Sequence, residues 1–226
     1  MNMWVNDIQE LAREGSFVAI DVEGDGNNPQ SPVEIAAVEF AKGEVAAVRC
    51  WLVNPGLPMS EFVQGLHGIT DDMLRDKPAF SEIEHEVRSL LEGRAVVAHG
   101  ASEDLAMLRS VMPDVDFVPA AVLDTQRMAR NLLPALDRYR LDSVREALGI
   151  DLPAPPDGRR WGFHSAENDA FAAGVAFLKL AELVVGPAKA RRHASRMAHV
   201  VMSPQQQARR LDELAALGLA PRGPGR

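Results

Sequence analysis

The sequence has little of what disulfide-stabilised, secreted or membrane-spanning proteins require. Cys50 is the only cysteine among 226 residues, so an intrachain disulfide cannot form. No apolar run approaches the roughly 20 residues that a membrane-spanning helix needs. The N-terminal segment, MNMWVNDIQELAREG, contains acids where a secretion signal would have an apolar core. We therefore expect no membrane association and a cytoplasmic location.

Positive charge is also scarce over most of the chain. The formal net charge is −8, and residues 187–226 contribute +6, which leaves −14 for residues 1–186. Such an acidic body argues against broad electrostatic binding of a polyanion. It does not exclude a nucleic-acid enzyme whose acids hold metal cations. The basic segment fits a solvated helical extension as well as a functional one.

The pattern of apolar residues predicts an α/β domain over residues 1–186, followed by a basic helical extension over 187–226 with a frayed end. The expected strands cover 17–22, 33–40, 44–53, 94–99 and 120–125, and the expected helices cover 6–13, 80–93, 102–111, 141–148 and 165–185. The first three strands are close enough in sequence to form an antiparallel meander. The later alternation of helix and strand then implies a mixed sheet with helices on its faces.

Two acids end an apolar segment near the N-terminus. In FVAIDVEGDG, Asp21 and Glu23 stand at the end of an apolar run that is expected to be a buried strand, just before a glycine-rich turn. Side chains two residues apart on a strand point to the same face, so both carboxylates aim at one spot. Like charges that close repel unless a cation lies between them, and carboxylate oxygens suit Mg²⁺ or Mn²⁺. The pair predicts a metal site, although it is also typical of a solvated strand end.

A histidine followed five residues later by an aspartate occurs three times, at His67–Asp72, His99–Asp104 and His164–Asp169. Asp104 and Asp169 fall in the early turns of expected helices, where ligands gather over the strand ends of α/β sheets. Ser165 is expected to cap the helix that carries Asp169. An acid near a helix start can also serve only to interact with the helix dipole. His67–Asp72 lies in a turn region, where no expected helix begins over the end of a strand.

The order of the motifs resembles that of the DEDDh 3′–5′ exonucleases, which include the proofreading subunit of the bacterial replicative polymerase, oligoribonuclease and ribonuclease T. The likeness covers about residues 16–183. It is carried by AIDVEGDG, VEIAAVEF, GLHGITDDMLRDKPAFSEI, VVAHGASEDLAMLR, VLDTQRMAR, RLDSVREALGI and FHSAENDAFAAGVAFLKL. Several motifs in one order are far more specific than any acid pair.

This resemblance implies a ribonuclease H-like fold with a five-stranded mixed sheet flanked by helices. It implies two divalent cations, Mg²⁺ or Mn²⁺, and a histidine that acts as general base. The implied metal ligands are Asp21, Glu23, Asp104 and Asp169, the implied base is His164, and the implied substrate-binding residues are Gly24, Leu66 and His67. His67 is equally well explained as a hydrogen-bonded turn histidine.

The implied reaction is hydrolysis at the 3′ end of single-stranded DNA or RNA with release of nucleoside 5′-monophosphates. A polymerase or a second subunit could bind through the C-terminal extension. Three departures from the family pattern bear on substrate contacts: Gly24 replaces a hydroxyl residue, Gly100 replaces an asparagine, and Glu103 replaces an aromatic residue. The alternative is a noncatalytic nucleic-acid-binding or polymerase-associated module that retains the fold.

Overall fold

The computed structural model describes residues 5–112, 118–152, 165–184 and 198–199. His164 and almost all of the predicted basic extension lie outside these ranges. The strands are β1 (Ser16–Gly24), β2 (Pro32–Ala41), β3 (Glu44–Leu52), β4 (Ala95–Ala98), β5 (Ala121–Asp124) and β6 (Ala198–His199). The helices are α1 (Val5–Arg13), α2 (Glu61–His67), α3 (Asp71–Leu74), α4 (Phe80–Leu91), α5 (Ser102–Val111), α6 (Thr125–Leu132), α7 (Leu141–Ala147) and α8 (Ala166–Leu183).

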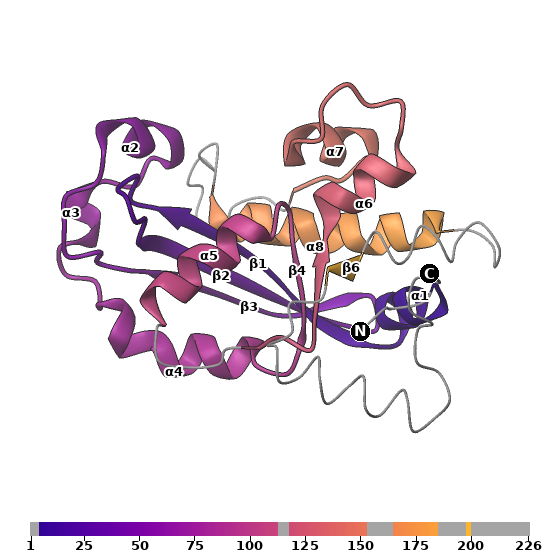
Figure 1. The fold of residues 1–226 in the computed structure, drawn as a ribbon, viewed down its shortest axis with the longest axis horizontal. Coiled ribbons are helices and arrows are strands. Elements are labelled where there is room, and N and C mark those ends of the chain that lie inside the picture. The colour runs from indigo at the N-terminus through magenta and orange to yellow at the C-terminus, as the bar shows by residue number, and fades with distance from the viewer. Residues whose placement is uncertain (1–4, 113–117, 153–164, 185–197, 200–226) are drawn as a thin grey trace, which may run out of the picture.

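The predicted five-stranded mixed sheet is present, and the two-residue strand β6 extends it at one edge. The strand order is β3-β2-β1-β4-β5-β6 (Figure 1). Strands β1, β2 and β3 form the expected antiparallel meander, with Lys42 and Gly43 at positive φ in the turn between β2 and β3. Strands β4 and β5 run parallel to β1. The parallel strands end at the same edge of the sheet as β1, which brings the loops that follow them together.

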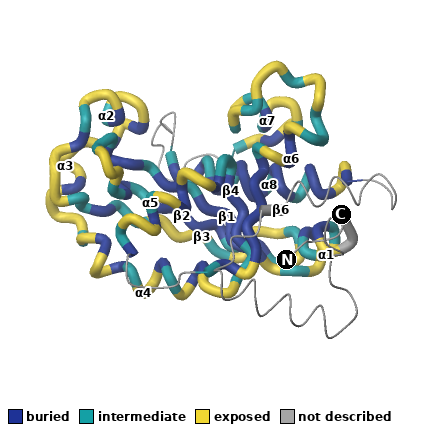
Figure 2. The backbone as a smooth tube through the Cα atoms, in the orientation of Figure 1, coloured by how far each residue is buried: buried dark blue, intermediate teal, exposed yellow. Residues whose placement is uncertain are grey.

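Strand β1 is buried on both faces because helices cover both sides of the sheet. Phe17 and Ala19 belong to a core cluster with residues of α1, α6 and α8. Val18 and Ile20 belong to the opposite cluster, with residues of α4 and α5. Figure 2 shows the central strands buried and the outer turns of the helices exposed. The alternation of side chains along β1 therefore decides which helix each of its residues meets.

Helix α8 packs close to the sheet at Gly174. A Cβ added to Gly174 would lie 2.2 Å from a ring carbon of Phe40 and 3.1 Å from the Ala19 side chain. The Phe40 ring stacks on Phe17 with the ring centroids 4.8 Å apart, so it has little room to move away. The glycine thus fixes how near the helix lies to β1 and β2.

The expected helix ranges do not include three of the observed helices, α2, α3 and α6. Helix α2 has seven residues and α3 has four, and both lie between β3 and α4. Phe62 and Leu66 of α2 are exposed, so this helix lacks the usual pattern of an apolar inner face and a polar outer face. Within the part of the chain that the structure describes, no helix is both long and apolar enough to span a bilayer.

Replacement of Gly174 with alanine should destabilise the protein, because the added methyl group would push α8 away from the sheet. We expect a loss of about 1–3 kcal/mol in the free energy of unfolding, measured by urea denaturation. Gly65→Ala in α2 is the matched control, because a Cβ there meets no heavy atom within 4 Å. Gly65→Ala should be neutral or stabilising. Equal stability of the two variants would contradict this account of the packing.

Candidate active site

A pocket of about 400 Å³ lies over the C-terminal end of β1. It is bordered by α2 on one side and by the loop that leads into α7 on the other, both at the top of Figure 1. The lining residues are Asp21, Val22, Glu23, Gly24, Gln30, Val63, Leu66, His67, His99, Gly100, Glu103, Asp104, Met107, Gln126, Arg140, Leu141 and Asp169. The pocket therefore collects residues from both ends of the described sequence.

Three of the predicted ligands form a tight group. Asp21 and Glu23 extend from the face of β1 that also carries Phe17 and Ala19, which is the face covered by α8. Asp169 lies in the first turns of α8. One carboxylate oxygen from each of Asp21, Glu23 and Asp169 lies within 4.8 Å of the others. Residues 146 positions apart in sequence thus face one point in the pocket.

Asp104 reaches the same pocket from the opposite side of the sheet. It lies in the first turn of α5 and only 6% of its surface is exposed. Its Oδ1 accepts a hydrogen bond of 3.0 Å from the backbone N–H of Val22, which lies between Asp21 and Glu23. This bond joins α5 to the end of β1, although Asp104 is not part of the three-residue oxygen group.

Burial and repulsion by neighbouring charges raise the pKa values of Asp21, Glu23 and Asp104. Burial raises the pKa of Asp21 well above its usual value, and the charges of Asp104 and Asp169 raise it further. Burial raises the pKa of Glu23 to about 8, with the charge of Asp169 as the next cause. Burial also raises the pKa of Asp104 to about 7, although the hydrogen bond from Val22 opposes the change.

This donor set fits a hard divalent cation. Carboxylate oxygens are the ligands that Mg²⁺ and Mn²⁺ prefer, and a cation between the acids relieves the repulsion that raises their pKa values. Surface acids that face solvent singly would not show such shifts. The alternative of a solvated strand end does not fit, because burial is the largest cause of each shift.

The three histidine–aspartate pairs differ in their surroundings. Asp104 and Asp169 line the pocket, whereas Asp72 is exposed and forms an ion pair with Arg75. The His99 ring bridges Thr125 Oγ1, at 3.0 Å from Nδ1, and Tyr139 O, at 2.9 Å from Nε2. Burial lowers the pKa of His99, so a neutral ring donates from Nε2 and holds the strand end in place.

Gly24, Leu66 and His67 all line the pocket, as a substrate-binding role requires. His67 is buried, and its Nδ1 accepts a hydrogen bond of 3.1 Å from the Ile69 N–H. His67 is the last residue of α2, so it is a hydrogen-bonded residue at a helix end that also lines the pocket, and the two interpretations of His67 are compatible. Leu66 is 37% exposed and offers an apolar surface at the rim.

The structure gives physical reasons for two of the departures. A Cβ at Gly24 would lie 2.9 Å from Met107 Sδ and 3.2 Å from Gln30 Oε1, so these side chains fill the space that a hydroxyl residue would take. Gly100 has φ of +86°, a conformation that glycine adopts without strain and asparagine tolerates better than most residues. Glu103 is exposed and lines the pocket.

Sequence reasoning missed Arg140. It is the only lysine or arginine among the described residues that line this pocket. Its Nε lies 3.8 Å from Asp142 Oδ1. Its side chain is 64% exposed, so it remains accessible to a polyanion. Its one signal in the sequence is its place at the start of RLDSVREALGI, directly before α7.

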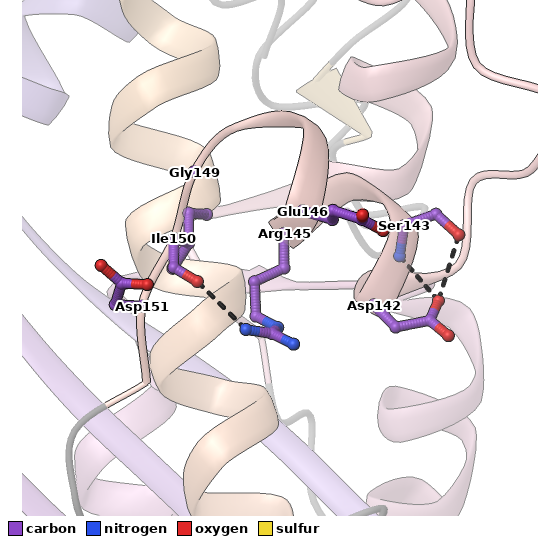
Figure 3. A pocket seen from close by; sticks show the side chains of 7 residues that line it. All are labelled: Asp142, Ser143, Arg145, Glu146, Gly149, Ile150 and Asp151. Atoms are coloured by element: carbon purple, nitrogen blue, oxygen red, sulfur yellow. Dashed lines mark hydrogen bonds between the residues drawn. The ribbon is translucent and has the colours of Figure 1, made fainter.

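A second pocket, of about 350 Å³, lies at α7 and has a structural explanation (Figure 3). Arg145 Nη1 donates to the Ile150 carbonyl at 3.1 Å, which secures the chain after the helix. Asp142 Oδ1 accepts from the Ser143 N–H and the Ser143 hydroxyl. These groups satisfy one another within one turn-and-helix segment, so the pocket does not resemble a second reaction centre.

Comparisons with known proteins agree with the predicted resemblance. The RNase_T family model, described as an exonuclease, matches residues 18–177. DNA polymerase III PolC-type of Caldanaerobacter subterraneus subsp. tengcongensis is 31% identical over 176 residues, which make up 76% of this chain and 12% of that protein. The 3′-5′ exonuclease DinG of Bacillus subtilis is 31% identical over 171 residues, or 74% of this chain and 18% of that protein. The chain therefore spans only a small part of the length of these relatives.

The fold comparison leads to the same family. The structure of exonuclease X in complex with 5′ overhanging duplex DNA aligns with a TM-score of 0.61 and 25% sequence identity, covering 79% of this chain and 99% of that one. The ribonuclease H-like fold and the resemblance to DEDDh exonucleases are thus confirmed. Because the family model covers well over half of the sequence, the chain belongs to the RNase_T exonuclease family.

Proposed function

We propose that the chain is a metal-dependent 3′–5′ exonuclease that hydrolyses the terminal phosphodiester bond of single-stranded DNA or RNA. The proposal rests on the approach of the Asp21, Glu23 and Asp169 oxygens to within 4.8 Å of one another in an open pocket. Such a group of half-buried acids would repel a phosphate directly but suits cations that bind a phosphate. The products are a nucleoside 5′-monophosphate and a strand shortened by one nucleotide.

Two divalent cations, Mg²⁺ or Mn²⁺, held by Asp21, Glu23, Asp104 and Asp169, would stabilise the charge on the phosphate and lower the pKa of the attacking water. The hydrogen bond from the Val22 N–H orients the Asp104 carboxylate. His164 accepts the proton of the attacking water, because an imidazole titrates near neutral pH. It lies directly before Ser165, and so a few residues before Asp169 in the sequence.

The other residues of the pocket suit the 3′ end of a single nucleic-acid strand. Gly24, Leu66 and His67 are the proposed contacts of the 3′-terminal nucleotide, with Leu66 presenting apolar surface to the base. Arg140, on the other side of the pocket, is the proposed contact of a backbone phosphate, because a guanidinium binds phosphate oxygens in pairs. The terminal 3′-hydroxyl distinguishes this end from the rest of the strand.

A polymerase is the proposed protein partner, because relatives of this chain include DNA polymerase III PolC-type proteins. The basic segment 187–226 is the proposed contact region, on the basis of its charge. The cytoplasm is the proposed location, as expected for a sequence with one cysteine.

The reaction can be tested with 3′-labelled and 5′-labelled single-stranded DNA and RNA in Mg²⁺, Mn²⁺ or EDTA. We expect labelled mononucleotide from the 3′ label first, and none in EDTA. Asp169→Asn should reduce the rate by at least about 100-fold, because it weakens the binding of the cations that would stabilise the negative charge of the transition state. Asp72→Asn is the control, since Asp72 belongs to the same sequence pattern but is exposed. Saturable binding without cleavage in Mn²⁺ would favour the noncatalytic alternative.

Replacement of His164 with alanine should slow cleavage by about 10²- to 10⁴-fold while Mn²⁺ binding is retained, because a general base does not hold the metal. Single-turnover rates and calorimetric titration with Mn²⁺ separate the two effects. His85→Ala is the control, because His85 lies on α4, outside the pocket. Parallel losses of metal affinity and rate would contradict the role of His164 as a base.

The metal-free protein should lose stability as pH rises from about 5 to about 8. The pKa of Glu23 is about 8 in the folded protein, against an ordinary value of 4.5, so the folded state binds more protons than the unfolded chain across this window. Thermal unfolding in EDTA measures the trend, and Mn²⁺ should raise the melting temperature more at pH 8 than at pH 5. Glu23→Gln should flatten the EDTA profile. A wild-type profile as flat as that of Glu23→Gln would contradict the assignment.

A further inference from the structure

The N-terminus of α8 is held by a side chain from the sheet. The Ala166 N–H, in the first turn of the helix, donates a hydrogen bond of 2.9 Å to Glu34 Oε2. Glu34 lies on β2, 132 positions earlier in the sequence. Ser165 occupies the N-cap position but makes no capping hydrogen bond through its side chain. The acceptor that a local cap would normally supply therefore comes from β2.

The capped turn is the one that carries Asp169. The Asp169 N–H donates to the Ser165 carbonyl at 3.0 Å, which closes the turn that begins beside Glu34. Loosening of this turn would move the Asp169 carboxylate relative to Asp21 and Glu23. A displacement of about 1 Å at a reaction centre can cost roughly 100-fold in rate.

The position of Glu34 is otherwise unfavourable. It is directly opposite Glu23 in the β1–β2 register, and like charges facing each other across a sheet are destabilising. The positive end of the helix dipole and the Ala166 N–H offset this repulsion. The thiol of Cys50 donates to the other oxygen, Oε1, at 3.5 Å, so both oxygens of the carboxylate are engaged.

We propose that Glu34 is a positioning residue that fixes the Asp169 carboxylate by capping α8 from β2. It acts through the helix and touches neither the substrate nor the reacting atoms. The effect on cleavage rests on the proposed function, whereas the effect on the helix does not. The cap requires an oxygen acceptor rather than a negative charge, which distinguishes it from a general electrostatic role.

Two substitutions separate the acceptor from the charge. Glu34→Ala removes both, and Glu34→Gln keeps a carbonyl oxygen that can accept from Ala166. Glu39→Ala is the matched control, because Glu39 lies on the same strand but pairs with Arg94 and Arg49. Glu34→Ala should lower kcat by about 10- to 100-fold with little change in KM. Glu34→Gln should retain kcat within about threefold, and Glu39→Ala should behave like the wild type.

Hydrogen–deuterium exchange without metal tests the helix independently of activity. Glu34→Ala should speed exchange of the amides at residues 166–169, whereas Glu34→Gln should not. Wild-type exchange in Glu34→Ala would overturn the proposal, and so would equal losses of kcat in Glu34→Ala and Glu34→Gln. If the wild-type protein does not cleave, the proposed function fails, and the exchange experiment still decides whether Glu34 caps the helix.

Discussion

Repulsion among carboxylates at the end of β1 is the constraint on which the site depends. Asp21 and Glu23 are partly buried beside Asp169, and Asp104 is buried next to them. Separated in water, these groups would ionise near pH 4, but here burial raises the pKa of Glu23 to about 8. The acids can stay together because packing on both faces of β1 holds their backbone in place. A cation bound between the acids would turn this unfavourable arrangement into a favourable one.

The two layers of helices make different contributions to that arrangement. Helix α5 brings Asp104 from one face and secures it through the Val22 N–H. Helix α8 brings Asp169 from the other face, at a distance from the sheet that Gly174 and Phe40 set. Strand β2 contributes through Glu34, which holds the first turn of α8. The site is thus assembled from four elements whose mutual distances are fixed by the core.

The periodicity of the sequence predicted most of the elements that build this frame. Alternating or continuous apolar runs predicted β1 to β5. Most residues of β1, β2, β4 and β5 are buried, whereas β3 has the apolar pattern but no buried residue. Helices α2 and α3 were not predicted, since they are short and α2 exposes Phe62 and Leu66. Arg140 was missed because its place beside the pocket depends on which loop faces the pocket and not on its neighbours in sequence.

The sequence by itself determined the acid types, their order and the strand alternation that places Asp21 and Glu23 on one face, because these depend on local geometry. The spacing of five residues is the same in His99–Asp104, His164–Asp169 and His67–Asp72, so spacing alone could not show which pairs belong to the site. Only the tertiary structure brought Asp104 and Asp169 to β1 from opposite faces of the sheet. It also replaced the expected cap at Ser165 by Glu34, because a hydrogen-bond acceptor 132 positions away is near the helix only after the sheet and α8 have packed.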